Sequence, residues 1–589
     1  MRQLMSQRLP NHKLTLKKKN GFCDRILLHS PVQQIQFKYS FKHHPSAIRA
    51  ISPQNQHIFQ QSRFYVSLAV LSSISTLKII SKKFKLIAKM HTEHESIRSE
   101  AQLHFTSMVR PPSFIKCLWK VLISTLPNAA YSFFQCILII INVHFVSSDE
   151  NEKMVAGLGL GIVWLTATTC GPILALNTGT TVLASQAFGA LNYELVPVYF
   201  YRAIVLRVLQ SIPCYIFCAC SVWIFKLLDF DETVAEAASA CCVYSFIAII
   251  GIIIYDTLKA FVNAHALFFP IMIIQLIVVV AHWFYCKFFA ETLNLGITGV
   301  TIAFGISQLT GGVILIGYVL LSKNFKKTLK WPHKNILRGI WTQFINEIYI
   351  SSFIMLQWIA YMLCVLMGGG FTLKEVVSQT FIYNIALLLF APILALSETS
   401  MILIGKALGR KEALKAINIS KALITMTVIF LLIEILLLLL FTHDMVRFLI
   451  KDEGIIEDTT STLMAYIWLM PADFIQITFT SILKSAARER IGALMFFLSF
   501  FAIGVTVAFV LGLLLRWAAH GIWIGMGIGI YTMAFLAGML LWKTDFECQI
   551  RKIDDRLVSD ESGALELSTN RIEDSERFSS SRWRKHSDM

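Results

Sequence analysis

Charged residues are scarce in this 589-residue sequence. Asp, Glu, Lys and Arg make up 15% of it, against about a quarter of a soluble domain, whereas 55% of the residues are hydrophobic. A globular core cannot bury so much apolar surface, so the expected solvent is a lipid bilayer. The sequence also lacks the GxxxxGK phosphate-binding loop, which excludes a self-contained ATP-driven pump. Neither terminal region has the apolar pattern of a packed enzyme domain, so we do not expect an enzyme.

Cysteine and histidine are present without the spacing that disulfide or metal sites need. None of the twelve cysteines forms a CxxC pair, and no two histidines are separated by three to five residues. Most cysteines lie inside apolar runs, where Cys behaves as a small hydrophobe. The sequence therefore predicts neither a disulfide framework nor a metal site, and no cofactor is expected.

The net charge of +16 comes almost entirely from the N-terminal region. Residues 1–89 contain sixteen Lys and Arg and a single acid, Asp24. Because the rest of the chain is close to neutral, we do not expect nucleic-acid binding. Residues 1–113 are expected to be basic and mostly disordered. For residues 1–89 three interpretations stay open: a basic tail, an acid-poor transit segment, or sequence upstream of a translation start at Met90.

Apolar runs long enough to cross about 30 Å of hydrocarbon recur twelve times. Six lie within residues 114–322 and six within 340–542, separated by a basic linker, 323–339. The runs span 114–146, 154–183, 196–227, 233–262, 267–289, 296–322, 340–367, 376–404, 417–442, 458–483, 490–515 and 517–542. We therefore predict an all-α polytopic membrane protein with twelve transmembrane helices, followed by a charged, disordered tail over 543–589.

The loops between these runs alternate in charge. The loops around 323–338, 406–415 and 484–490 are basic, whereas those around 149–152 and 229–236 are acidic. Cytoplasmic loops of membrane proteins carry the excess of Lys and Arg. The alternation therefore predicts that the basic loops and both termini face the cytoplasm.

An internal repeat relates the two sets of six runs. Pro172-Ile-Leu-Ala-Leu176 recurs 220 residues later as Pro392-Ile-Leu-Ala-Leu396, and the register continues to Gly189 and Gly409 with eight identities in eighteen positions. Both copies end in an expected cytoplasmic loop. The repeat predicts two pseudo-symmetric six-helix bundles, an N-lobe over 114–322 and a C-lobe over 340–542. Duplicated bundles that rock about a central site are typical of secondary transporters.

Four sequence blocks resemble motifs of a known family. Leu183-Ala-Ser-Gln-Ala-Phe-Gly-Ala-Leu-Asn-Tyr193 is similar to SQAfGAxny, the hallmark that follows the second helix in the multidrug and toxin extrusion (MATE) family. Val155-Ala-Gly-Leu-Gly-Leu160 resembles the start of that helix, the segment from Pro392 to Gly409 resembles the eighth helix, and His520-Gly-Ile-Trp-Ile-Gly525 resembles the start of the twelfth. The blocks cover roughly 114–542 in the family's order and spacing.

The resemblance implies a monomeric antiporter that exports organic solutes, often cationic, in exchange for protons or possibly Na+. Eukaryotic members usually use protons, and they imply a plasma-membrane or vacuolar/lysosomal location. Two alternatives remain: a lipid-linked or other solute flippase of related fold, and a non-transporting member. A major-facilitator carrier also has twelve spans, but the SQAFGA block and a missing loop aspartate argue against it.

Asp473 is the strongest candidate for the coupling site. It lies eleven residues before Lys484, about 16 Å along a helix from the basic loops and so near the middle of the membrane. Pro471 beside it weakens the local helix bonding. An acid in hydrocarbon is costly and therefore a functional candidate, and burial favours exchange of its proton. The family resemblance implies a tenth-helix carboxylate at a C-lobe cation site; a structural Asp bonded to a hydroxyl is the alternative.

Three further acids are candidates with open interpretations. Asp256 is the rough counterpart of Asp473 in the N-lobe, but Lys259 one turn away also suits a structural salt bridge. Glu398 lies two turns from Lys406. Glu347 lies close to the expected interface, where solvation is easy.

The sequence departs from the family at the seventh and eighth helices. Where the resemblance implies a pattern like clEwWafE, this chain has Gln357 and Met362 in place of the glutamates, and Asn384 in place of an eighth-helix glutamate. This puts the family's network of several carboxylates in doubt. Gln357, Trp358 and Tyr361 remain candidates for hydrogen bonding to a solute or stacking on it, with core or lipid packing as the alternative for the aromatic rings.

Overall fold

A computed structural model describes residues 112–147, 152–227, 230–330, 336–367, 373–449, 460, 463, 464 and 467–561. Everything before residue 112 and after residue 561, including the expected N-terminal disorder, lies outside this described part. The described residues contain helices and no strand, as the sequence predicts.

The described residues of the first half of the chain form nine α-helices, several of which join end to end. They are α3 (Phe114–Ser147), α4 (Glu152–Leu165), α5 (Gly171–Gly189), α6 (Leu195–Ala219), α7 (Ser221–Leu227), α8 (Glu232–Tyr244), α9 (Phe246–Ala264), α10 (Phe269–Cys286) and α11 (Gly296–Leu321). A π-helical turn, Thr166–Cys170, continues α4 into α5. This junction makes one long span from two helices.

The second half repeats the arrangement. Its helices are α12 (Ile340–Met367), α13 (Leu373–Gly409), α14 (Ala413–Leu449), α16 (Met470–Ser485), α17 (Glu489–Phe497), α18 (Thr506–Phe509) and α19 (Ala518–Trp542). Within the described chain, eleven helical segments are long and apolar enough to cross a membrane. The twelfth expected span, 458–483, is represented by α16, which starts only at Met470.

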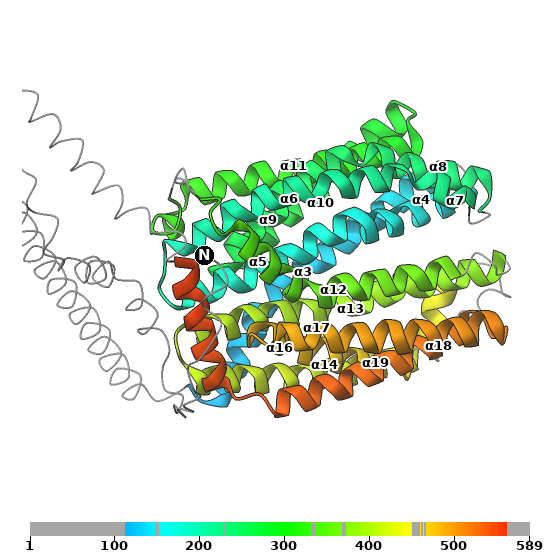
Figure 1. Cartoon of the computed structure of the whole chain (residues 1–589). Helices are drawn as coiled ribbons and strands as arrows, with labels where there is room; N and C mark the ends of the chain where they lie inside the picture. The colour runs from blue at the N-terminus through cyan, green and yellow to red at the C-terminus, as the bar shows by residue number, and fades with distance from the viewer. Residues whose placement is uncertain are drawn as a thin grey trace, which may run out of the picture. The chain divides into compact units, whose positions relative to one another are not determined.

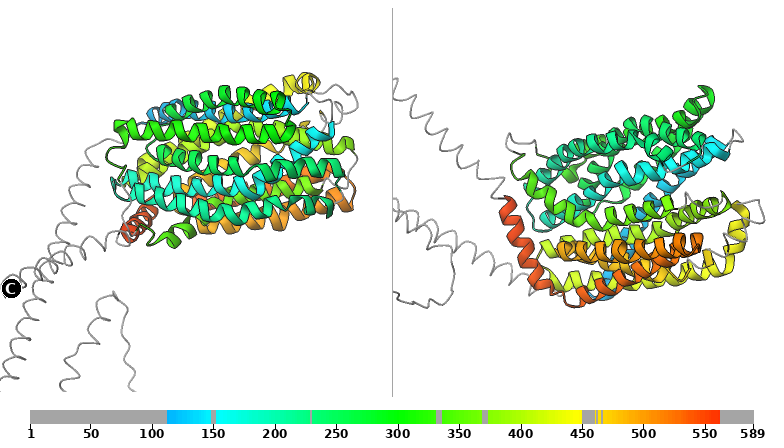
Figure 2. Two further views of the ribbon diagram at one scale, coloured as in Figure 1. Left: turned by 90° about the horizontal axis from the view of Figure 1, so that it is seen from above. Right: turned by 45° about the vertical axis from the view of Figure 1, so that its right-hand side comes forward.

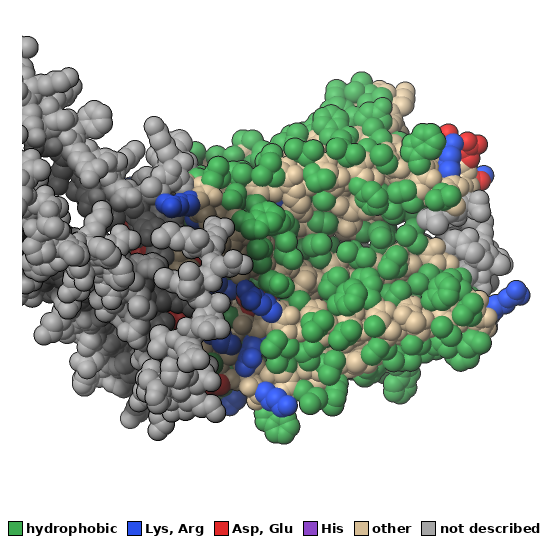
Figure 3. All heavy atoms as spheres, in the orientation of Figure 1, with side chains coloured by type: hydrophobic (Ala, Val, Ile, Leu, Met, Phe, Trp, Pro, Cys, Tyr) green, Lys and Arg blue, Asp and Glu red, His purple; other side chains and the backbone are tan. Residues whose placement is uncertain are grey.

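The bundle has an apolar exterior and polar groups inside. Large hydrophobic side chains such as Ile115, Leu440 and Phe535 stay more than half exposed, and such side chains cover the flank of the bundle in Figure 3. Lys and Arg gather at one end of that flank. We call the end that carries the loops after α5, α9, α11, α13 and α16 the basic end. An apolar flank around buried polar groups is the arrangement expected of a protein in a bilayer.

The helices group into two lobes that run side by side (Figures 1 and 2). Helices α4 to α11 form the N-lobe and α12 to α19 the C-lobe. Helix α3 contacts both, since it packs against α10 of the N-lobe and against α13 and α14 of the C-lobe. Pro127 lies inside α3. The expected N-lobe boundary at residue 114 thus assigns to one lobe a helix that both lobes share.

The two copies of the sequence repeat cross each other at the basic end. A Cβ atom on Gly405 would lie 2.5 Å from the hydroxyl of Ser185, which is its own counterpart at the 220-residue offset. Gly189 approaches the backbone of Lys406 and Gly409 approaches that of Gln186 in the same reciprocal way. The absence of side chains at these glycines therefore lets α5 and α13 touch along a pseudo-twofold axis.

The hydrogen bonds at this crossing follow the same symmetry. Gln186 donates from Nε2 to the carbonyl of Ser485 at 2.9 Å. Lys406, 220 residues later, donates from Nζ to the carbonyl of His265 at 3.1 Å. His265 and Ser485 are themselves 220 residues apart. Each bond links one lobe to the other, so the basic end is closed in this structure.

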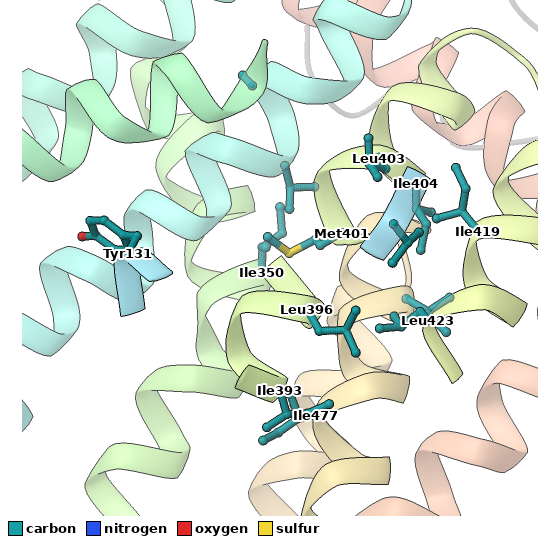
Figure 4. Close-up of a cluster of buried hydrophobic side chains, with 14 of the residues drawn as sticks. Tyr131, Ile350, Ile393, Leu396, Met401, Leu403, Ile404, Ile419, Leu423 and Ile477 are labelled. Atoms are coloured by element: carbon teal, nitrogen blue, oxygen red, sulfur yellow. The ribbon is translucent and has the colours of Figure 1, made fainter. Parts of the chain in front are cut away.

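Apolar packing joins the helices next to the crossing. In Figure 4, Ile393 of α13 lies beside Ile477 of α16, and Leu396 of α13 points toward Leu423 of α14. These side chains are buried in one hydrophobic cluster that continues to Tyr131 of α3. In a bilayer the alternative to such contacts is lipid, which is as apolar as these side chains, so close van der Waals packing is what stabilises them.

The prediction of disorder after residue 542 is wrong for residues 546–561, which form a helix. This C-terminal helix lies across the end of the bundle (Figures 1 and 2). Ile550, Ile553 and Leu557 share one face of it and are buried. The sequence analysis missed this spacing of three and four residues because charged residues interrupt it.

Candidate functional site

Asp473 lies in the first turn of α16 and is buried, with 1% of its surface exposed. Its Oδ2 accepts a hydrogen bond from the hydroxyl of Tyr361 on α12 at 3.0 Å. Its Oδ1 is also buried and has no hydrogen-bond partner within the described residues. Pro471 occupies the start of the helix, and the amide groups of a helix N-terminus favour a carboxylate there. The structure therefore brings together two of the predicted site residues, Asp473 and Tyr361.

Glu398 of α13 connects the two lobes. Its Oε2 accepts from Asn128 of α3 at 3.3 Å and its Oε1 from Asn263 of α9 at 3.1 Å. Asn128 also donates to Thr399 at 3.2 Å. The buried ammonium of Lys484 lies within electrostatic reach of Glu398. This carboxylate therefore has both amide donors and a nearby cation.

Asp256 of α9 forms the salt bridge that its spacing from Lys259 suggests. Nζ of Lys259 lies 2.9 Å from Oδ1 of Asp256, and Asn177 of α5 donates to Oδ2 at 2.8 Å. Lys259 also lies over the ring of Tyr131 at 4.6 Å from its centroid. Both oxygens of Asp256 are thus occupied by partners.

Glu347 differs from its expected position near a solvated interface. Its side chain is fully buried and forms an ion pair with the equally buried Arg207 of α6. The other oxygen accepts from Thr180 at 2.7 Å and from Gln343 at 2.8 Å. Glu347 lies deep because Gly179 of α5 leaves room for the backbone of α12 at this point. The ion pair joins the two lobes.

The remaining predicted residues lie along α12 and α13. Gln357 and Trp358 are half-buried, and the Trp358 ring packs against Gly171 of the N-lobe. The Tyr361 ring lies 6.4 Å from that of Trp523 on α19. Asn384 belongs to α13, but its side chain lies outside the described residues.

The buried ionisable residues that sequence reasoning missed include Arg207, Lys484 and Glu434. Lys484 was interpreted as a loop charge and Arg207 was not singled out, yet both are buried. Glu434 of α14 is 8% exposed, and its Oε2 has no hydrogen-bond partner within the described residues. Arg207 and Glu434 each interrupt a long apolar run, which is the signal that could have identified them, whereas Lys484 lies just after the end of one.

Four of the buried acids differ in how their charge is balanced. Glu347 and Asp256 each form an ion pair with a cation, and Glu398 lies near Lys484. Asp473 instead has a neutral hydroxyl as its hydrogen-bond partner. A buried carboxylate without a cation is costly when ionised and less so when protonated. Asp473 is therefore better placed than these three acids to change its protonation state.

No cluster of three or more His, Cys, Asp or Glu side chains within the described chain could hold a metal ion.

Comparison with known proteins gives consistent matches. The MatE family model matches residues 125–287 and 350–510. The chain is 22% identical over 447 residues to Protein DETOXIFICATION 14 of Arabidopsis thaliana, covering 74% of this chain and 90% of that protein. It is 22% identical over 394 residues to Multidrug and toxin extrusion protein 2 of Oryctolagus cuniculus, covering 66% of this chain and 65% of that protein.

Solved structures share the fold. The crystal structure of the eukaryotic MATE transporter AtDTX14 matches with a TM-score of 0.70 at 20% identity, covering 75% of this chain and 99% of that one. An outward-facing multidrug resistance MATE family transporter of the MOP superfamily matches with a TM-score of 0.61 at 15% identity, covering 76% and 100%. The predicted architecture of two six-helix lobes is confirmed.

Proposed function

This chain belongs to the MatE family of multidrug and toxin extrusion transporters, and from that premise we propose that it exports organic solutes in exchange for protons by alternating access. The solutes are cationic or amphipathic, the chain acts as a monomer because it contains both lobes, and the coupling carboxylate is Asp473. We place the basic end on the cytoplasmic side of a plasma or vacuolar/lysosomal membrane, and the excess of Lys and Arg in its loops supports this orientation.

The observation that supports this proposal is the environment of Asp473. Tyr361 occupies Oδ2 and leaves Oδ1 without a partner among the described residues. A proton can therefore bind at Oδ1 while the bond from Tyr361 is kept. When the proton leaves, the hydroxyl of Tyr361 still donates to the carboxylate, and a cationic solute would supply the missing positive charge.

The aromatic side chains of α12 suit such a solute. Tyr361 already contacts Asp473, and Trp358 lies one turn before it on the same helix. A cation next to an aromatic face gains about 0.5–2 kcal/mol. Competition between proton and solute for one carboxylate couples the two movements in opposite directions, because occupation by either excludes the other.

The test is uptake of the fluorescent organic cation ethidium by sealed proteoliposomes under an imposed pH gradient. We expect gradient-driven uptake by the wild type and its loss in Asp473→Asn, which keeps the shape but cannot ionise. Glu434→Gln is the matched control, because Glu434 is another buried acid that lies on α14. It should keep most of the gradient response.

Two results would contradict the proposal. Equal gradient-driven uptake by wild type and Asp473→Asn would remove Asp473 from the coupling step. Wild-type protein that does not respond to the gradient would exclude proton exchange and favour a flippase or a non-transporting member.

A further inference from the structure

The C-terminal helix, residues 546–561, is attached to the C-lobe. It follows α19 after only three residues. Asp554 forms an ion pair with Lys411 at 2.9 Å, and Arg556 forms one with Glu489 at 3.0 Å. Lys411 and Glu489 belong to the loops and helix starts of the C-lobe at the basic end. The buried face of Ile550, Ile553 and Leu557 adds apolar contact.

The same helix also binds the N-lobe. The hydroxyl of Tyr199 on α6 donates to Asp560 at 2.6 Å. Asn192, just after α5, donates to Glu561 at 2.9 Å. Asp560 and Glu561, the last two described residues, thus bind the N-lobe, although the helix is covalently joined to the C-lobe. Figure 2 shows the helix lying across the ends of both lobes.

Arg556 reaches the crossing of the two repeats itself. Its guanidinium donates to Oε1 of Gln186, while Nε2 of the same amide donates to the carbonyl of Ser485. A guanidinium can only donate, so it fixes the amide with its oxygen toward Arg556 and its NH2 group toward the C-lobe. The symmetry-related Lys406 needs no such donor beside it, because its ammonium group has no acceptor atom and only donates to the carbonyl of His265. The crossing is therefore asymmetric, and its Gln186 half is completed from outside the transmembrane helices.

We propose that the C-terminal helix is a strap that closes the basic end of the transport path. It moves with the C-lobe, and its bonds to Tyr199, Asn192 and Gln186 break each time the basic end opens. Arg556 is a positioning residue that acts through Gln186. This inference rests on the alternating-access part of the proposed function.

The first test links the strap covalently to either lobe. Asn192→Cys with Glu561→Cys joins it to the N-lobe, and Lys411→Cys with Asp554→Cys joins it to the C-lobe, both through a short thiol-cleavable bis-methanethiosulfonate reagent. The background carries Cys23→Ser, Cys220→Ser and Cys548→Ser, which removes the cysteine outside the described residues, the exposed thiol among the described ones and the thiol of the C-terminal helix. Ethidium uptake by proteoliposomes is measured before and after reduction.

We expect the N-lobe link to lower uptake at least about tenfold, because it confines the protein to one state, and reduction to restore it. The C-lobe link is expected to leave uptake unchanged. Full uptake with the N-lobe link in place would overturn the strap proposal. An equal loss of uptake with the N-lobe link and with the C-lobe link would also overturn it, because the helix would then have to leave the C-lobe during transport.

The second test does not require transport. Ser185→Cys places a thiol at the buried crossing, and its reaction rate with a membrane-impermeant maleimide reports opening of the basic end. Arg556→Ala is expected to speed labelling severalfold, and Arg556→Lys, which can still donate to Gln186, to restore a slow rate. Unchanged labelling in Arg556→Ala would refute the role of Arg556. If labelling depends on Arg556 while the wild type shows no gradient-driven uptake, the strap stands and the proposed coupling falls.

Discussion

The buried ion pair between Arg207 and Glu347 gives a quantitative prediction about how the lobes are held together. Both side chains are fully buried, and they come from different lobes. Replacing Glu347 with Leu leaves the guanidinium without its charged partner and removes the acceptor for Thr180 and Gln343. Removing one member of a buried pair costs about 3–5 kcal/mol, mostly because the other charge stays buried and uncompensated.

The double variant separates this cost from the value of the pair. Replacing both partners by apolar residues of similar volume is often neutral or stabilising by about 1–4 kcal/mol. We therefore expect Glu347→Leu and Arg207→Met each to lower the melting temperature by several degrees in detergent, and Arg207→Met/Glu347→Leu to recover most of the loss. The double-mutant cycle should yield a coupling of at least about 2 kcal/mol.

Purified, monodisperse protein and tryptophan fluorescence during heating provide the measurement. Val319→Leu changes a buried apolar residue and is the control for core substitution in general. It should show no coupling to Arg207→Met. If the two single losses simply add, or if each is below about 1 kcal/mol, Arg207 and Glu347 are not a desolvated pair and the reasoning fails.

Further predictions concern the crossing of the repeats and the loop beside it. Gly405→Ser should destabilise the protein by about 1–3 kcal/mol, because the new side chain meets Ser185. The double variant Gly405→Ser/Ser185→Gly exchanges the two residues across the pseudo-twofold axis and should restore the melting temperature. Additive losses in the double variant would refute the close approach of the two positions. Burial, helped by Lys406 and opposed by the bond to Phe261, lowers the pKa of His265 from 6.5 to about 4. The fold thus favours the neutral ring, so stability should fall by about 3 kcal/mol as the pH drops from about 6.5 to about 4 and level off below. His265→Asn, whose amide can still donate to the Phe261 carbonyl, should flatten this dependence in thermal melts between pH 4 and pH 7, and an unchanged slope would show that another group titrates.

The pattern of residues along the chain was sufficient for the architecture but only partly for the site. Periodic apolar runs and the 220-residue repeat predict two six-helix lobes. Asp473 stands out because an isolated acid in an apolar run is energetically costly in hydrocarbon and therefore needs a specific environment. The same rule applies to Arg207 and Glu434, which the sequence analysis passed over. Glu347 was expected near solvent because its distance from the loop was counted along one helix, without the opposing glycine of α5.

The sequence by itself determined that this chain lies in a membrane, because its apolar runs have no other solvent, and that it is duplicated, because the register of the repeat persists to Gly189 and Gly409. Tertiary structure alone decided which charges meet. Arg207 finds Glu347 140 residues away, and Arg556 finds Gln186 370 residues away. Such pairs depend on how two lobes dock, and hydrogen bonds and ion pairs act over a few ångströms of space whatever the separation along the chain.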